Sequence, residues 1–238
     1  MKNNKELPLG KRARFSKASK TVLKVSGKHV LYSIKKPFVS NKQKEASQHT
    51  HYKKISKDIF KLLSILKGVS LKAAQMMSME LELLPKEFND ELKKACYKVP
   101  PLNRALVRKG IHSEFGKSPE TLFSTFTSKA FAAASIGQVH KAILKTNEKV
   151  VVKIQYPGIE QTIQSDMKML TYLLLKLPIP KIKEKQILIK TYLDECESRF
   201  IEETDYKKEA SRLDFFYKEN PFKTIQIPKP TLDMCTKT

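Results

Sequence analysis

Cysteine, long apolar runs and, in the first third of the chain, acidic side chains are scarce in this 238-residue sequence. Cys96, Cys196 and Cys235 are odd in number and lack C-x-x-C spacing, which argues against a disulfide framework or a zinc site and favours a reducing compartment. No apolar run approaches the length of a bilayer span, and the N-terminus lacks the apolar core of a signal peptide. We therefore expect a cytoplasmic protein that is not inserted in a membrane, with a peripheral position at the inner face of a membrane left open.

The shortage of acidic residues makes the N-terminal part strongly basic. Residues 1–70 hold 18 Lys and Arg against three acidic residues, so +15 of the net charge of +22 lies there. Residues 1–45 are predicted to be a basic arm, either solvated and partly disordered or binding an anionic membrane surface, where each exposed Lys or Arg adds about 1 kcal/mol. Nucleic acid ranks last as a partner, because aromatic residues do not alternate with the basic ones as stacking platforms.

Helical patterns follow and partly overlap this arm. Within it, one side of a short helix could be lined by Val22, Val25, Val30, Leu31 and Ile34, with Gly27 interrupting the helix. Residues 46–128 are predicted to form a helical extension, in which the helix over 104–115 is ended by Gly116. Another helix is predicted over 159–177, ended by prolines, and helix again over 186–220.

Two β-prone runs, over residues 138–145 and 149–155, are separated by a short polar segment and predict an antiparallel hairpin. Lys153 lies in the middle of the second run. On its own, a lysine in such a run is typical of an edge strand whose side chain reaches water. The small residues and the hairpin that precede Lys153 instead favour the nucleotide lysine of a kinase-like lobe, which pairs phosphates with the help of a helix glutamate.

AAASIGQVH, residues 132–140, and VVVKIQYPGI, residues 150–159, resemble the UbiB family of atypical protein-kinase-like proteins, also called aarF-domain-containing kinases. The resemblance implies an α+β fold: a kinase-like small lobe, with an antiparallel sheet and helix C, over residues 129–238. It also implies an alanine-rich loop over the nucleotide phosphates where ordinary kinases carry glycines. The residues implied to bind nucleotide are Ala132, Ala133, Ala134, Ser135, Val139, Lys153 and Glu209.

Two further segments carry the resemblance. GVSLKAAQMM, residues 68–77, is similar to the family's KxGQ signature, with Lys72 and Gln75 as its lysine and glutamine and Ala74 in place of the glycine. FIEETDYKKEA, residues 200–210, resembles the family's ExD motif, Glu203 and Asp205, followed by the helix-C glutamate, Glu209. By itself this acidic run is more typical of a solvated helix face. Because Glu209 is predicted to share a face with Leu213 and Phe216 that packs on the sheet, its carboxylate needs a cation, for which Lys153 is the candidate.

The sequence ends without a His-x-Asp…Asn catalytic loop or an Asp-Phe-Gly segment, so we expect the large lobe to be absent and the chain to be incomplete for catalysis. The resemblance implies an ATP-dependent atypical kinase or ATPase that supports ubiquinone biosynthesis. ATP or ADP is the expected ligand, Mg²⁺ only if a partner or a further segment supplies the large lobe, and no metal site is predicted within the chain. The alternative is a non-catalytic kinase-like remnant that acts through its basic arm.

The clustered acids and the KxGQ helix together predict a lid. One lysine cannot neutralise four acidic residues, so Lys72 is predicted to reach Glu203 or Asp205 and fasten the helical extension across the nucleotide lobe. Gln75, on the same helical face, would add a hydrogen bond. In this interpretation Lys72, Gln75, Glu203 and Asp205 have a gating role and none is a catalytic base.

Overall fold

The computed structural model describes residues 11–36, 40–66, 68–80, 83–93, 102–134, 136–222 and 224–237. The chain forms two compact units, and each is built from two separate stretches of sequence. Unit 1 consists of Met1–Lys98 and Gln161–Glu197, and unit 2 of Val99–Glu160 and Ser198–Thr238.

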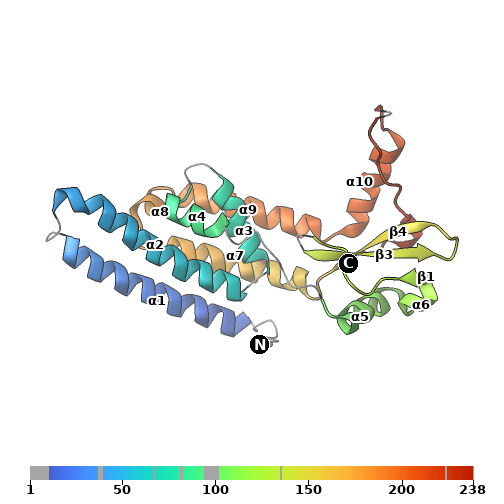
Figure 1. Cartoon of the computed structure of the whole chain (residues 1–238), viewed down its shortest axis with the longest axis horizontal. Coiled ribbons are helices and arrows are strands. Elements are labelled where there is room, and N and C mark those ends of the chain that lie inside the picture. The colour runs from blue at the N-terminus through green and yellow to red at the C-terminus, as the bar shows by residue number, and fades with distance from the viewer. Residues whose placement is uncertain are drawn as a thin grey trace. The chain divides into compact units, whose positions relative to one another are not determined.

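Unit 1 is helical (Figure 1). Its helices are α1 (Lys11–Lys35), α2 (Asn41–Leu66), α3 (Gly68–Met79), α4 (Lys86–Lys93), α7 (Ile159–Leu175), α8 (Pro180–Glu184) and the first part of α9 (Gln186–Glu203). The core of the unit follows helical spacing: Ala18, Val22 and Val25 of α1 are buried, as are Ile55, Ile59 and Leu62 of α2. Ile163, Met167 and Leu170 of α7 are also buried, so three long helices contribute the apolar core.

Helix α1 differs from the predicted basic arm in two respects. It runs through Gly27 without interruption. That glycine is exposed, and nothing lies within 4 Å of the position that a β-carbon would occupy. The helix is also attached to the bundle, since α1 packs on α2 along its length (Figure 1). The interruption predicted at Gly27 is therefore wrong. α2 ends at Leu66, and Gly68 is itself the first residue of α3.

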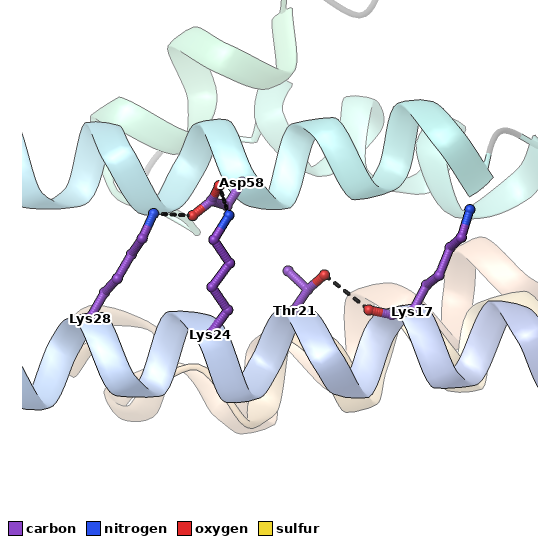
Figure 2. A network of polar contacts seen from close by, with 5 residues as sticks. All are labelled: Lys17, Thr21, Lys24, Lys28 and Asp58. Atoms are coloured by element: carbon purple, nitrogen blue, oxygen red, sulfur yellow. Dashed lines mark hydrogen bonds and ion pairs between the residues drawn. The ribbon is translucent and has the colours of Figure 1, made fainter.

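One carboxylate holds two lysines between α1 and α2 (Figure 2). Lys24 Nζ lies 2.8 Å from Asp58 Oδ1 and Lys28 Nζ lies 2.5 Å from Oδ2. Burial alone would raise the pKa of Asp58, but the hydrogen bonds from the two lysines outweigh it and lower that pKa. Asp58 thereby fixes two of the many α1 cations at a defined position on α2.

Unit 2 contains an antiparallel sheet of β1 (Phe123–Phe126), β2 (Ala132–Ala133), β3 (Gly137–Leu144) and β4 (Lys149–Gln155) (Figure 1). β3 is the central strand. β4 pairs along it from Gly137↔Gln155 to Ile143↔Lys149, while β2 and β1 pair one after the other with the opposite edge. The predicted hairpin over 138–145 and 149–155 is confirmed to within one residue.

The helices of unit 2 cover two faces of this sheet. α5 (Arg104–Phe115) packs on β4, and Gly110 lies where a side chain would contact the Ile154 side chain. The Asn103 side chain caps the start of α5, and Gly116, with φ of 64°, ends it as predicted. α6 (Pro119–Leu122) leads into β1, and α10 (Tyr206–Lys218) places Glu209 against Lys153 on the other face. The expected α+β small lobe with helix C is confirmed.

Helix α10 is rotated relative to the predicted stripe. Phe216 was expected to pack on the sheet together with Glu209, but it is 58% exposed. The inward residues are Ala210, which is buried, and Tyr206 and Leu213, which are half-buried. The division of the sequence at residues 45 and 128 stays a prediction.

Candidate functional site

Three of the predicted nucleotide-binding residues lie in one row across the sheet. Ala132 on β2 pairs directly with Val139 on β3, and Val139 pairs directly with Lys153 on β4. Residues that are directly opposite in antiparallel strands point to the same face of a sheet. The row therefore runs from a small exposed side chain to a lysine ammonium on a single face.

Lys153 and Glu209 form an ion pair on this face. Lys153 Nζ lies 2.7 Å from Glu209 Oε1 and 2.6 Å from Oε2, so the ammonium contacts both carboxylate oxygens. The lysine side chain is 33% exposed and the glutamate side chain 51%. The contact predicted between them is present, although its predicted cause is not, because the carboxylate faces solvent and is not buried in an apolar stripe. Such an exposed pair contributes only about 0–1 kcal/mol to stability and remains accessible to a competing anion.

An aromatic ring forms a second contact with the same ammonium. Lys153 Nζ lies 4.6 Å from the centre of the Tyr206 ring, within the range of a cation–π interaction. Burial raises the pKa of Tyr206, and the neighbouring Glu209 and Glu203 raise it further. Sequence analysis missed Tyr206, since nothing in the spacing of a single tyrosine distinguishes it from a packing residue. Its position directly after the ExD motif was the available clue.

Gly137 makes room for Tyr206. A β-carbon at position 137 would lie 2.8 Å from the Tyr206 hydroxyl oxygen and would also collide with the backbone oxygen of Ile154. Only glycine therefore permits this ring to approach the start of β3. The Tyr206 hydroxyl and that of Tyr156 are buried, and neither has a hydrogen-bond partner among the described residues.

Three members of the acidic cluster, Glu202, Asp205 and Glu209, have local partners. The Asp205 side chain accepts a hydrogen bond from the Lys208 backbone N–H at 3.1 Å and caps the start of α10. Glu202 pairs with Arg212, which lowers the pKa of that carboxyl, and Glu209 pairs with Lys153. Lys153 therefore does not neutralise all four acids, as expected, but a helix N-terminus and an arginine share that role, which the sequence-based prediction gave to Lys72.

A buried polar chain supports the opposite face of β3. Gln138 and His140 are both fully buried. Gln138 Oε1 accepts the Leu102 backbone N–H at 2.7 Å, and its Nε2 lies 2.8 Å from His140 Nε2. His140 Nδ1 lies 2.8 Å from the Thr127 carbonyl oxygen, so the chain is satisfied if neutral His140 carries its proton on Nδ1. These residues fix the strand that carries Val139, and sequence analysis did not identify them.

The remaining predicted residues are placed as follows. Ala133 lies in β2, the Ala134 backbone N–H donates to the Gly137 carbonyl oxygen at 2.9 Å, and Ser135 lies outside the described residues. The alanine segment thus begins as a strand, where a loop was expected. Lys72 and Gln75 lie on α3 of unit 1 and are half-buried, and Ala74 beside them is buried. Their predicted contact with Glu203 or Asp205 of unit 2 stays a prediction.

Metal-binding residues do not gather in the part of the chain that the structure describes. No group of three or more His, Cys, Asp or Glu side chains there is arranged to hold a metal ion. The chemistry that this face offers is therefore one ammonium, held by a carboxylate and an aromatic ring beside a row of small side chains. That arrangement suits an anion with several oxygen atoms, such as a phosphate group.

Residues 94–238 match the family model described as the ABC1 atypical kinase-like domain. Over 162 residues the chain is 36% identical to the protein ACTIVITY OF BC1 COMPLEX KINASE 8, chloroplastic, of Arabidopsis thaliana, covering 67% of this chain and 21% of that protein. Over 154 residues it is 36% identical to the atypical kinase COQ8, mitochondrial, of Saccharomyces cerevisiae, covering 64% and 30%. It is 32% identical over 178 residues to the probable protein kinase UbiB of Pseudomonas fluorescens, covering 73% and 33%. The aligned region spans about a fifth to a third of the length of these relatives.

Proposed function

The chain belongs to the ABC1 atypical kinase-like family, which includes proteins named UbiB and COQ8, and on this basis we propose that unit 2 binds the phosphates of ATP or ADP through Lys153. The observation that carries the proposal is the Lys153–Glu209 ion pair at the end of the row formed by Ala132, Val139 and Lys153. A half-exposed ammonium beside small side chains can accept a charged ligand without rearrangement of the strand. Family membership supplies the identity of that ligand.

Each residue has a distinct role in this proposal. The Lys153 ammonium donates hydrogen bonds to phosphate oxygens, and Glu209 orients it. The small residues 132–135 lie over the phosphates, and the Val139 side chain packs beside the ligand. Because alanine β-carbons restrict the backbone and block the close approach that glycine allows, transfer to protein substrates is disfavoured. Mg²⁺ requires ligands from a large lobe, supplied by a partner or by a further segment.

At the level of the whole protein we propose an ATP-dependent atypical kinase or ATPase that supports ubiquinone biosynthesis. The family assignment supports this role, and the lid predicted from Lys72, Gln75, Glu203 and Asp205 would gate access to the site. The alternative is a kinase-like module without catalysis. These two functions differ in whether nucleotide binds to Lys153 at all.

Nucleotide binding can be measured with a fluorescent ADP analogue. We expect Lys153→Ala to weaken binding by about 10-fold or more, because hydrogen bonds from a charged donor contribute about 1.5–3 kcal/mol. Lys141→Ala is the matched control, since Lys141 lies on the same face of the same sheet but contacts the Phe131 ring. Equal affinity of wild type and Lys153→Ala, or no binding by wild type, would reject the proposal in favour of the non-catalytic module.

A second proposed function, association with an anionic membrane surface, is favoured by the outward face of α1. Leu23, Val30 and Ile34 recur on one helical face and are 56–73% exposed, whereas the buried residues of α1 lie on a different face. Residues 7–44 contain eleven Lys and Arg and no acidic residue. An apolar face flanked by cations is typical of helices that lie in the lipid interface. Among the described helices, none is long and apolar enough to cross a membrane.

Vesicle sedimentation can test this surface. We expect binding that requires acidic lipid and falls steeply with salt, because exposed charges are screened over about 10 Å at 0.1 M. Leu23→Ser combined with Ile34→Ser should reduce binding by roughly 10-fold or more, since burying each apolar side chain contributes about 1.5–3 kcal/mol. Leu106→Ser combined with Ile225→Ser, at exposed positions of unit 2, is the control. Equal binding to neutral vesicles would reject the electrostatic component, and tighter binding to single-stranded nucleic acid would favour that partner instead.

A further inference from the structure

We propose that Tyr206 is a second positioning residue for Lys153, holding the ammonium with the face of its ring while Glu209 holds it by charge. Tyr206 and Glu209 lie three residues apart at the start of α10, so a single helical turn presents both groups to the lysine. Lys153 Nζ lies 4.6 Å from the ring centre and 2.6 Å from the nearer carboxylate oxygen. The role in ligand binding rests on the nucleotide function proposed above.

Tyr206 is anchored more firmly than Glu209. Its backbone N–H donates to the Lys237 carbonyl oxygen at 3.0 Å, and Asp205 caps the helix directly before it. Gln155 Nε2, at the end of β4, donates to the Thr204 carbonyl oxygen at 3.0 Å, which fixes the same turn to the sheet. The ring inserts against Gly137, where no side chain competes for the space. Glu209, in contrast, has its carboxylate half in solvent.

The two contacts behave differently when an anion arrives. Phosphate oxygens compete with the Glu209 carboxylate, because both accept hydrogen bonds from the three N–H donors of the ammonium. A ring face takes up none of these donors, since it attracts the charge through its quadrupole. Tyr206 therefore keeps Lys153 over the sheet face while the ammonium divides its donors between Glu209 and phosphate.

The ring is the part of Tyr206 that acts, and not the hydroxyl. The hydroxyl oxygen is buried against Gly137 and has no hydrogen-bond partner among the described residues, so it neither orients Lys153 nor receives a proton from it. Replacement of Tyr206 by phenylalanine should therefore preserve the positioning, whereas replacement by leucine should remove it at similar apolar volume. This difference separates positioning from simple packing.

The experiment measures acetylation of Lys153 in the whole chain by mass spectrometry after brief treatment with acetic anhydride. The ring lies against the amine and limits its access to the reagent, so loss of the ring should raise the rate at which Lys153 reacts. We expect a 2- to 5-fold increase in Tyr206→Leu, equivalent to about 0.5–1 kcal/mol, and no change in Tyr206→Phe. Melting temperatures of both variants check that the fold is retained.

Lys141 provides an internal control in the same sample. Its Nζ lies 4.3 Å from the centre of the Phe131 ring on the same face of the sheet, and it does not depend on Tyr206. Its rate should stay constant in Tyr206→Leu. The reciprocal variant Phe131→Leu should raise the rate of Lys141 and leave that of Lys153 unchanged. A change at both lysines in either variant would indicate general loosening of the sheet and would overturn the inference.

A second measurement separates this inference from the nucleotide proposal. Affinity for the fluorescent ADP analogue should fall 2- to 5-fold in Tyr206→Leu and stay within the error of wild type in Tyr206→Phe. If wild type binds no nucleotide but the acetylation pattern is as expected, the nucleotide function fails and the positioning role stands. If wild type binds nucleotide but Tyr206→Leu alters neither affinity nor acetylation, the positioning role is rejected alone. If Tyr206→Phe and Tyr206→Leu changed the acetylation rate and the affinity equally, the role would belong to the hydroxyl and the inference would be overturned.

Discussion

Buried His51 and half-buried His29 form an imidazole pair between α1 and α2. His29 Nδ1 lies 3.1 Å from His51 Nε2, and the Tyr32 ring stacks on His51 with ring centres 4.1 Å apart. Burial lowers the pKa of His51 to about 4, and the charges of His29, Lys54 and Lys28 act in the same direction. Burial and the charges of Lys183 and Lys36 lower the pKa of His29. The pair is therefore neutral in the folded unit, where cations and not carboxylates surround it.

This pair predicts acid sensitivity of unit 1. In the unfolded chain His51 titrates near 6.5, so between that pH and about 4 the unfolded chain binds more protons at His51 than the folded chain does, and the lowered pKa of His29 acts in the same direction. Stability should then fall as the pH is lowered through this window, by up to about 1.4 kcal/mol per pH unit for His51. Urea unfolding at pH 7.5, 6 and 5 would measure it. His51→Gln should flatten the dependence and His112→Gln, at an exposed position, should not; an unchanged slope in His51→Gln would contradict the assignment.

Two glycines illustrate how the same substitution has opposite effects in different helical positions. Gly116 ends α5 in the left-handed region, with φ of 64°, whereas Gly27 lies within α1 with open space around it. We expect Gly116→Ala to lower stability by about 1–2 kcal/mol, because an L-residue is strained there. Gly27→Ala should raise stability by about 0.5–1 kcal/mol. Thermal unfolding of both variants tests the pair, and a shift of the same sign in both would contradict the structural difference.

Elements with a strong local pattern could be predicted from the sequence. The hairpin of β3 and β4 follows from period-two alternation, and α5 from apolar periodicity with Gly116 at its end. β1 and β2 could not be predicted, because Phe123–Phe126 shows no apolar alternation and Ala132–Ala133 has little strand propensity. Both are strands because β3 offers them a free edge, which is a tertiary effect.

Within the candidate site, the charged residues Lys153 and Glu209 could be predicted from the sequence, but the aromatic ring of Tyr206 beside them could not. The Lys153–Glu209 pair follows from the family motifs, whereas the inward face of α10 was misassigned to Phe216. Apolar and aromatic residues of α10 lie on more than one side of the helix, so its sequence fits more than one buried face. The ring of Tyr206 decides the rotation of the helix, and it can do so only because Gly137 on another element leaves space. A contact of this kind is not encoded within either segment.

The stretches of sequence that form the two units alternate along the chain. A fragment can therefore fold by itself only if it keeps both stretches of one unit. A fragment of residues 99–238 would retain α7, α8 and α9 but lose α1 to α4. Ile163, Met167 and Leu170 are buried in unit 1, and their removal from that core would expose a contiguous apolar face. We expect this fragment to aggregate and to bind hydrophobic dyes, as measured by size-exclusion chromatography and fluorescence. A fragment joining 99–160 to 198–238 through a flexible linker should stay monomeric, and a monomeric 99–238 fragment without dye binding would contradict the expectation.

The same alternation sets an order of events on the ribosome. Helices α1 to α4 are synthesised before α7 and α9 exist, so unit 1 cannot close until about a hundred further residues have been added. At the usual rate of synthesis this takes about 5–20 s, during which β3 and β4 are made and can pair locally. The apolar faces of α1 to α4 therefore stay uncovered while part of unit 2 forms. Substitutions that prolong this interval would reduce the yield of folded protein without changing the stability of the finished chain.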